Sequence, residues 1–228
     1  MTKKISVLVP TYNRARYISQ CIESVLDQSF KDFEIIVVDD GSTDNTKEIL
    51  RSFGRHISYF YQENKGIPSA RNSCVEKSNC PLLAFIDSDD VWCKDKLERQ
   101  YEYLLEHKEV DIVFSPYKNF LDGGDPEQQA VKDELSFDSR TCMVSALIKK
   151  ELFNKYGLFS ELLKTGEDSE WVMRLALNGV DTRHCLDEFG FYRRIHSSNS
   201  FLNPKAKNID VLRVLAKTVR QKVMTKGR

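Results

Sequence analysis

The chain has 228 residues, of which 41% are hydrophobic and 30% charged; this is the composition of an ordinary globular protein and excludes fibrous and disordered classes. Lysine and arginine total 34, as do aspartate and glutamate, so the net charge indicates neither a nucleic-acid partner nor another polyanion. No apolar run approaches the ~20 residues that a membrane-spanning helix needs, and the run Ile5–Val9, which Pro10 ends, is too short for a secretion signal.

In the first half of the chain, short β-branched runs alternate with segments of helical periodicity. Nearly continuous apolar character, typical of strands covered on both faces, predicts strands at Ile5–Val9, Glu34–Asp39, Ile57–Tyr61, Leu82–Asp87 and Asp111–Phe114. Helices are predicted along the stripe from Ala15 to Leu26, from Ser42–Asn45 to about Phe53, and over Pro68–Lys77 and Lys94–His107. This order predicts an α/β fold with a doubly wound, mostly parallel sheet of the Rossmann type.

The alternation stops in the second half of the chain. A polar, turn-rich stretch from Asp122 to about Ser139 predicts a loop or flap. After it come an apolar stretch at Met143–Ile148, a helix at Asp168–Asn178, and short strands near Asp181–Leu186 and Phe189–Arg194. We expect a single domain at 1–204, made of a half at 1–117 and a smaller half at 118–204, and then a tail at 205–228.

Polar and acidic residues follow four of the predicted strands. In open parallel sheets, ligands bind at the carboxyl ends of the strands. The residues there are Pro10-Thr-Tyr12-Asn-Arg14, Asp39-Asp40-Gly41-Ser42, Asn64-Lys65-Gly66 with Arg71, and Asp87-Ser88-Asp89-Asp90. These groups suit a polar, anionic, metal-bound ligand. No G-x-G-x-x-G or G-x-x-x-x-G-K-[ST] motif follows a strand, which argues against dinucleotide oxidoreductases and P-loop enzymes.

The run from Asp87 to Asp90 is the sharpest local signal. Three carboxylates in four residues repel one another unless a cation compensates them. Mg²⁺ or Mn²⁺ would suit such a site, because these ions take oxygen ligands and keep positions open for phosphate oxygens. The alternative is that the acids only decorate the N-terminus of the next helix, where the helix dipole favours them.

The Asp39-Asp40 pair has two interpretations. It forms a turn and helix cap with Gly41 and Ser42, or one of its carboxylates accepts a hydrogen bond from a nucleobase N–H. Tyr12 offers an aromatic face on which that base would stack.

Together, these motifs resemble glycosyltransferase family 2. They are Val7-Leu-Val-Pro10-Thr-Tyr12-Asn, Val37-Val-Asp39-Asp40-Gly-Ser-Thr-Asp44, Asn64-Lys-Gly66 with Ala70-Arg71-Asn72, and Phe85-Ile-Asp87-Ser-Asp89-Asp90-Val-Trp92. They occur in the family's order, and the resemblance covers about residues 5–200. It implies a GT-A fold, in which 1–117 binds a nucleotide-sugar and 118–204 meets the acceptor. It also implies inversion of configuration and a divalent cation, Mn²⁺ or Mg²⁺.

The resemblance also assigns roles to single residues in the first half. Pro10, Tyr12 and Asp40 would line the nucleobase pocket, Arg71 would face the base or the diphosphate, Asp87 would contact the ribose, and Asp89 would bind the metal. The preference for uracil, and so for a UDP-sugar donor, depends on the match at Asp40 alone. Asp90 either joins the metal or caps the following helix.

In the second half, Thr165-Gly166-Glu167-Asp168-Ser-Glu170-Trp171 resembles the acidic motif that holds the catalytic base, at the position of Asp168. A carboxylate there would take the proton of the acceptor hydroxyl during attack on the anomeric carbon. Glu167 and Glu170 are alternative bases, and Glu167 with Asp168 would also suit a mere helix start. Tyr192-Arg193-Arg194-Ile-His196 resembles a late motif whose histidine and basic residues approach the metal or the diphosphate, although a lone histidine is as often structural.

The sequence thus predicts an inverting glycosyltransferase that moves a sugar from a nucleotide-diphosphate donor, with UDP favoured, to an acceptor hydroxyl. The acceptor would be a glycan, lipid-linked molecule or protein, in bacterial-type polysaccharide or glycoconjugate synthesis. One alternative is an inactive nucleotide-sugar-binding or regulatory domain. A sugar-phosphate nucleotidylyltransferase would need a glycine-rich loop where Pro10-Thr-Tyr12-Asn stands.

The last expectations concern the cellular location of the protein and the role of its tail. The six cysteines show no C-x-x-C spacing, which favours reduced thiols in the cytoplasm. Residues 205–228 hold eight Lys and Arg against one Asp, and Ile209, Leu212, Ala216, Val219 and Val223 recur at helical spacing. A basic amphipathic helix of this kind either lies on the inner face of an anionic membrane or packs on the domain or a second subunit.

Overall fold

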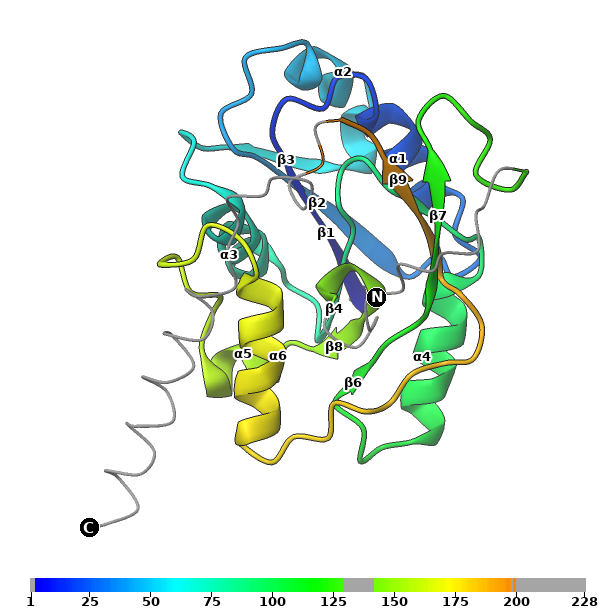
Figure 1. The fold of residues 1–228 in the computed structure, drawn as a ribbon, viewed down its shortest axis with the longest axis vertical. Helices are drawn as coiled ribbons and strands as arrows, with labels where there is room; N and C mark the ends of the chain where they lie inside the picture. Colours follow the sequence, from blue (N-terminus) through cyan, green and yellow to red (C-terminus); the bar gives the residue numbers. More distant parts are fainter. Residues whose placement is uncertain (1–2, 129–141, 198, 200–228) are drawn as a thin grey trace.

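The computed structural model describes residues 3–128, 142–197 and 199 (Figure 1). Its centre is a six-stranded sheet in the order β3-β2-β1-β4-β8-β6. The strands are β1 Ile5–Thr11, β2 Phe33–Asp39, β3 Ser58–Tyr61, β4 Leu82–Phe85, β6 Ile112–Val113 and β8 Leu147–Lys149. The pairs within β3-β2-β1-β4 are parallel, whereas β8 runs antiparallel to both β4 and β6. The predicted α/β class with a mostly parallel sheet is therefore confirmed.

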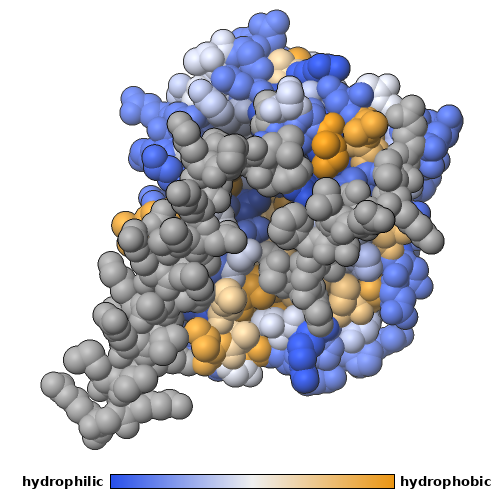
Figure 2. All heavy atoms as spheres, viewed as in Figure 1, coloured by the Kyte–Doolittle hydropathy of each residue, from blue (hydrophilic) through white to orange (hydrophobic). Residues whose placement is uncertain are grey.

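Six α-helices accompany the sheet in the described residues: α1 Ile18–Leu26, α2 Thr46–Ser52, α3 Ile67–Lys77, α4 Lys96–Glu106, α5 Glu151–Tyr156 and α6 Glu167–Leu177. Helices α1 and α4 turn an apolar stripe inward; in α1, for example, Ile18, Ile22 and Val25 are fully buried. Strands β1 and β2 are buried almost throughout, as expected of strands between two helical layers. Figure 2 shows a mostly hydrophilic described surface on this face, with apolar side chains in small separate patches.

A small second sheet brings the end of the described chain back to the carboxyl edge of the main sheet. It has the order β5-β9-β7, with β5 Val91–Trp92, β7 Tyr117–Leu121 and β9 Phe191–Ile195. Strand β5 directly follows the acidic run, and Val91 pairs with Tyr192. This pairing places the segment after β9 beside Asp89 and Asp90, about a hundred positions earlier in the chain.

The second half of the chain departs from the prediction in three places. Asp181–Leu186 is not a strand: it forms one isolated bridge, between Phe114 and Cys185. The side chain of Asp181 accepts hydrogen bonds from the backbone N–H and Nε of Arg183, and such a local turn competes with a strand ladder. Strand β7 and helix α5 were not predicted: the six residues of α5 are too few to show helical periodicity, and β7 mixes polar and apolar residues without a continuous apolar run. Met143–Ile148 is a 3₁₀ turn, Met143–Ser145, followed by the start of β8.

The remaining expectations concern the predicted flap, the tail and membrane spans. In the flap, residues 122–128 form turns, while 129–141 and the tail helix predicted at 205–228 lie outside the described residues. Within the described ranges, no helix combines the length and the apolar character needed to cross a membrane.

Candidate functional site

The segments singled out in the sequence meet at the carboxyl ends of β1, β2 and β4. The register pairs Thr11 with Asp39, so β1 and β2 end side by side. The backbone N–H of Asp40 donates to the carbonyl oxygen of Thr11 at 2.8 Å, which continues the contact beyond the sheet. The parallel sheet therefore assembles the predicted site residues of the first half at one edge.

The loop after β1 is locked to the loop after β2. Asn13 is the one non-glycine residue in the described chain with a left-handed backbone, at φ 51°. Its Oδ1 accepts from the backbone N–H of Thr43 at 2.8 Å, and its own N–H donates to Ser42 Oγ at 2.8 Å. These bonds hold Tyr12, whose side chain is 44% exposed, and the half-buried Pro10 at the edge of the site.

The carboxylates of Asp39 and Asp40 are both buried and both held by donors of the same chain. Asp39 accepts from the N–H of Ser42 and the hydroxyl of Tyr59. Asp40 Oδ1 accepts from Gln62 Nε2 at 2.7 Å and from the backbone N–H of Lys65 at 3.0 Å. Asp40 Oδ2 accepts from the backbone N–H of Gly66 at 2.8 Å. Neither carboxylate is wholly free, and the prediction that one of them accepts a hydrogen bond from a nucleobase stays a prediction. Because a carboxylate has about four acceptor positions, Asp40 Oδ2 keeps room for one more donor.

Arg71 joins the two halves of the site. Its Nη2 lies 3.0 Å from Asp87 Oδ1, while its Nη1 lies 2.7 Å from Glu167 Oε1 and 3.8 Å from Asp168 Oδ2. The guanidinium is buried, and its Nε meets no hydrogen-bond acceptor within the described chain. The side chain of Asp87 is 43% exposed, so this carboxylate faces both Arg71 and solvent. The acidic motif of α6 thus lies beside the acidic strand end of the main sheet.

The three acids at the start of α6 have different environments. Burial, with a smaller contribution from the charge of Asp168, raises the pKa of Glu167 to about 7 against the opposing effect of Arg71. Both oxygens of Glu170 are taken by Arg174, at 3.1 and 2.8 Å, and its side chain is almost fully buried. Asp168 is the most open of the three, with a side chain 20% exposed. Its Oδ1 accepts from the N–H of Ser169 in the first helical turn, which orients the carboxyl group.

Asp89 is the centre of a second cluster. Arg14 Nε and His196 Nε2 each lie 3.0 Å from the same oxygen, Asp89 Oδ2. Burial disfavours the charged carboxylate, but the hydrogen bond with His196 and the charge of Arg14 outweigh it and lower the pKa of Asp89. The ring of His196 stacks on that of Tyr17 at 4.8 Å between centroids, and the backbone N–H of His196 donates to Asn199 Oδ1. The predicted pair Asp89 and His196 is therefore brought together.

Asp90 belongs to the protein interior. Its side chain is buried, and burial, with the neighbouring charges of Asp89 and Asp87, raises its pKa well above the ordinary value. Asp90 Oδ1 accepts from the backbone N–H of Arg194, so the residue ties β9 to the acidic run. It does not cap a helix, because α4 begins only at Lys96. The reading of the acidic run as the decorated start of that helix is wrong for the same reason.

Two basic residues of this cluster stand in the quoted motifs: Arg14 had no predicted role, whereas Arg194 was among the basic residues predicted to approach the metal or the diphosphate. Arg14 contacts Asp89, and Arg194 donates from Nε to the carbonyl oxygen of Asp89 at 2.9 Å. Arg194 also lies over the rings of Tyr17 and Phe120. Basic residues in an otherwise acidic set of motifs were the only available signal, and it does not say which carboxylate each one meets.

The atoms at Asp89 that could bind a metal are of types that a divalent cation accepts as ligands. Asp89 Oδ1 receives no hydrogen bond within the described ranges, whereas Oδ2 is held by two donors. Carboxylate oxygen is a ligand that Mn²⁺ and Mg²⁺ accept, and imidazole is an additional ligand for transition metals. No set of three or more His, Cys, Asp and Glu side chains with metal-site geometry occurs in the described residues. A cation at Asp89 would therefore need further ligands, such as the phosphate oxygens of a nucleotide.

The comparisons with known proteins agree on one family. The sequence model of the family described as "Glycosyl transferase family 2" matches residues 6–160 of this chain. TuaG of Bacillus subtilis, a putative teichuronic acid biosynthesis glycosyltransferase, is 38% identical over 213 residues, which cover 86% of this chain and 82% of TuaG. S. aureus TarS in complex with UDP-GlcNAc is similar with a TM-score of 0.76 at 27% identity, over 95% of this chain and 66% of that one.

A more distant structure has the same fold. The mannosyltransferase PcManGT from Pyrobaculum calidifontis, in complex with GDP-Man and Mn²⁺, has a TM-score of 0.65 at 19% identity, over 87% of this chain and 59% of that one. This chain thus spans just under two thirds of each of these two solved structures. From the family match over more than half of its length and the identity to TuaG, we conclude that this chain belongs to glycosyltransferase family 2 and has the GT-A fold.

Proposed function

We propose that this chain transfers a sugar from a nucleoside-diphosphate donor to an acceptor hydroxyl, with inversion at the anomeric carbon. One observation carries the proposal: Arg71 contacts Asp87 at a strand end of the main sheet and Glu167 and Asp168 at the start of α6. The residues predicted to hold the donor and the residue predicted to act as base therefore share one site. Reactive groups need to be held close together in this way for a direct displacement.

The donor we propose is a UDP-sugar. Tyr12 presents an exposed ring on which a base would stack, and Pro10 lies beside it. Asp40 Oδ2 has room for one hydrogen bond, which a uracil N–H would supply. Solved complexes of S. aureus TarS, a relative by structure, contain UDP and UDP-GlcNAc, which supports the choice. Asp87 is the candidate for the ribose hydroxyls, because its carboxylate is open to solvent.

Asp89, with His196 beside it, is the proposed ligand of Mn²⁺ or Mg²⁺. When bound, such an ion would stabilise the negative charge that develops on the departing diphosphate. Four carboxylates, those of Asp87, Asp89, Glu167 and Asp168, surround the site against the guanidinium groups of Arg14 and Arg71. If all are charged, the acids exceed these two bases, and a cation would offset the excess. The Mn²⁺ complex of PcManGT comes from a protein that shares the fold.

Asp168 is the proposed general base. Its carboxylate would accept the hydroxyl proton of the acceptor while the oxygen attacks the anomeric carbon and the bond to the diphosphate breaks. A single displacement of this kind inverts the configuration. Glu170 is unsuited to this role because Arg174 holds both of its oxygens, and Glu167 is more buried than Asp168. Arg71 would keep Asp168 in place and add positive charge near the leaving group.

The acceptor we propose is a glycan in bacterial polysaccharide or glycoconjugate synthesis, lipid-linked or carried by a protein. The relationship to TuaG, a putative teichuronic acid biosynthesis glycosyltransferase, supports this class. We place the reaction in the cytoplasm, with residues 205–228 as a peripheral contact to the inner face of the membrane.

The test is a nucleotide-release assay over a panel of donor sugars, with Mn²⁺ or Mg²⁺ and with EDTA. We expect release from a UDP-sugar that stops with EDTA and falls by at least ~10²-fold in Asp89→Asn, because the leaving group loses its counter-charge. NMR of the product should show the anomeric configuration opposite to that of the donor. Metal-independent release by the wild type, or a product with retained configuration, would contradict the proposal.

A further inference from the structure

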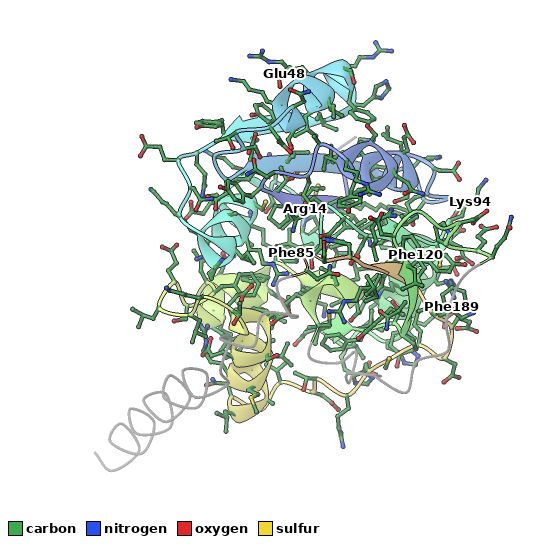
Figure 3. The ribbon with its side chains drawn as sticks, turned by 45° about the horizontal axis from the view of Figure 1, so that its top comes forward. Arg14, Glu48, Phe85, Lys94, Phe120 and Phe189 are labelled. Carbon is green, nitrogen blue, oxygen red and sulfur yellow. The ribbon has the colours of Figure 1, made fainter. Side chains whose placement is uncertain are left out.

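Arg14 places a positive charge on the carboxylate that the proposed function assigns to the cation. Its Nε lies 3.0 Å from Asp89 Oδ2, and its Nη1 donates to the carbonyl oxygens of Tyr12 at 3.3 Å and Asn13 at 3.2 Å. The side chain is only 23% exposed, and Figure 3 shows Arg14 near the middle of the molecule. The guanidinium is thus fixed between the loop after β1 and the acidic run.

The backbone of this loop holds Arg14 in place. The left-handed Asn13 is fixed by its bonds to Ser42 and Thr43, and the N–H of Arg14 donates to Thr46 Oγ1 at 2.9 Å. Withdrawal of the guanidinium from Asp89 would therefore break its bonds to two carbonyl oxygens of the loop. The same loop carries Tyr12, the proposed stacking surface for the base. One side chain accordingly connects the base-binding loop with Asp89.

The guanidinium of Arg14 acts against a cation that arrives at Asp89 alone. A divalent ion at Asp89 would lie close to a fixed guanidinium, and like charges at such a distance repel each other. A nucleoside diphosphate brings negative charge that compensates both cations. Removal of the charge of Arg14 should thus strengthen the binding of the ion most when no nucleotide is present.

We infer that Arg14 is a positioning residue that makes cation binding at Asp89 depend on the nucleotide. The inference rests on the proposed function in that Asp89 is the cation ligand and a nucleoside diphosphate is the donor moiety. In the wild type, the nucleotide and the metal would therefore bind as a pair. Without the guanidinium, the metal would bind by itself.

The experiment measures Mn²⁺ binding to the full chain by EPR of the free ion, with and without saturating UDP. In the wild type, UDP should strengthen Mn²⁺ binding strongly. Arg14→Gln keeps a long polar side chain but removes the charge. We expect it to bind Mn²⁺ without UDP at least about fivefold more tightly than the wild type and to gain correspondingly less from UDP.

Arg16→Gln is the matched control. Arg16 is a cation of the same loop, 70% exposed and paired with Asp122 at 3.0 Å, and in the part of the chain that the structure describes it forms no hydrogen bond or ion pair with Asp89. This variant loses the same charge two positions away and should retain the wild-type dependence on UDP. Arg14→Lys keeps the positive charge but lacks Nε. This variant should also retain the wild-type dependence of Mn²⁺ binding on UDP, so the inference stays testable if Arg14→Gln folds poorly. Equal loss of the dependence in both Arg14 variants would overturn the inference.

Asp89→Asn separates the two proposals. If the wild type fails to bind Mn²⁺ in the presence of UDP, or if Asp89→Asn binds it as well as the wild type does, the metal assignment in the proposed function is wrong. If Asp89→Asn loses Mn²⁺ while Arg14→Gln keeps the wild-type dependence on UDP, only the inference about Arg14 is overturned.

Discussion

At the scale of single residues, three neighbouring acids at the start of α6 have different tasks because their surroundings differ. Glu170 is bound through both oxygens to Arg174, Glu167 is buried against Arg71, and Asp168 alone is part-exposed. Identical chemistry within four positions thus yields a structural ion pair, a buried partner of Arg71 and a candidate base. The sequence favoured Asp168 only through the resemblance to the family's motif, since each of the three is an acid in the first turn of one helix.

We expect Asp168→Asn to slow sugar transfer by at least ~10²-fold while donor affinity changes little, because only the proton acceptor is lost. The measurement is kcat for transfer together with UDP affinity from calorimetry. Glu170→Gln is the matched control within the same helix: it should lower the free energy of unfolding by ~1–3 kcal/mol and leave kcat of the folded fraction near wild type. A large loss of kcat in Glu167→Gln with none in Asp168→Asn would assign the base to Glu167.

The buried Glu167 also predicts a pH dependence of stability. Its folded-state pKa, about 7, lies above the ordinary value, so the folded protein binds this proton more tightly than the unfolded chain does. Stability from this group is therefore complete below pH ~4.5 and is lost as pH rises towards ~7. Glu167→Gln stays neutral throughout, so its stability relative to wild type should rise by ~2–3 kcal/mol between pH ~5 and ~8.

Denaturant unfolding of both proteins at these two pH values checks the prediction. The comparison between variant and wild type removes the contributions of other titrating groups, such as Asp90, whose pKa is also raised. A difference in stability that stays constant with pH would contradict a buried, proton-binding Glu167.

At the scale of elements, the turns after β1, β2 and β3 determine the shape of the site. Gly41 has a φ of 83°, and a Cβ there would lie 2.8 Å from the backbone nitrogen of Asn64. The turn after β2 therefore touches the segment after β3, which Asp40 also holds through two backbone N–H groups. This close approach brings the second and third motifs of the sequence into one structure.

Gly41→Ala should cost ~2–4 kcal/mol of unfolding free energy, from left-handed strain together with the collision at Asn64. It should also weaken UDP binding, because the turns around Asp40 have to shift. Gly54→Ala is the control: its φ of 51° is also left-handed, but nothing lies within 4 Å of the added Cβ. It should cost only the strain, ~1–2 kcal/mol, and leave UDP affinity unchanged. Calorimetry and thermal unfolding measure both, and equal effects of the two variants would contradict the role of the Asn64 contact.

At the scale of the whole molecule, two sheets converge on the acidic run. The main sheet supplies Asp87 and Asp89 after β4, and the small sheet returns β9 to place Arg194 and His196 against Asp89. The basic tail at 205–228 follows this segment in the chain. If the tail contacts an anionic membrane, each nearby basic charge contributes about 1 kcal/mol at the surface.

Vesicle co-sedimentation of the full chain tests the tail. We expect binding to vesicles that contain anionic phospholipid, and weaker binding at high salt. Replacement of Arg213, Lys217, Arg220 and Lys222 by Gln should remove most of this binding while nucleotide release in solution stays unchanged. Equal binding of both proteins, or none by the wild type, would instead favour a tail that packs on the domain or on a second subunit.

The sequence by itself determined the parts that depend on local pattern. The apolar runs predicted β1 to β4, helical periodicity predicted α1, α3 and α4, and the four motifs indicated the family. These features are readable because burial on both faces of a parallel strand and on one face of a helix leaves a regular spacing of apolar residues. The nearness of His196 to Asp89 was also anticipated, but only through the resemblance of their motifs to those of the family.

Only the tertiary structure decided which charge meets which. Three features depend on contacts between segments that are distant in the chain. Arg71 lies among Asp87, Glu167 and Asp168. Arg14 shares Asp89 Oδ2 with His196, and Asp90 bonds to β9. Short pieces such as β5 and α5 gain stability from their neighbours and carry too few residues to show a period. Charge pairing across such contacts is set by the geometry of packing, which no local spacing of residues encodes.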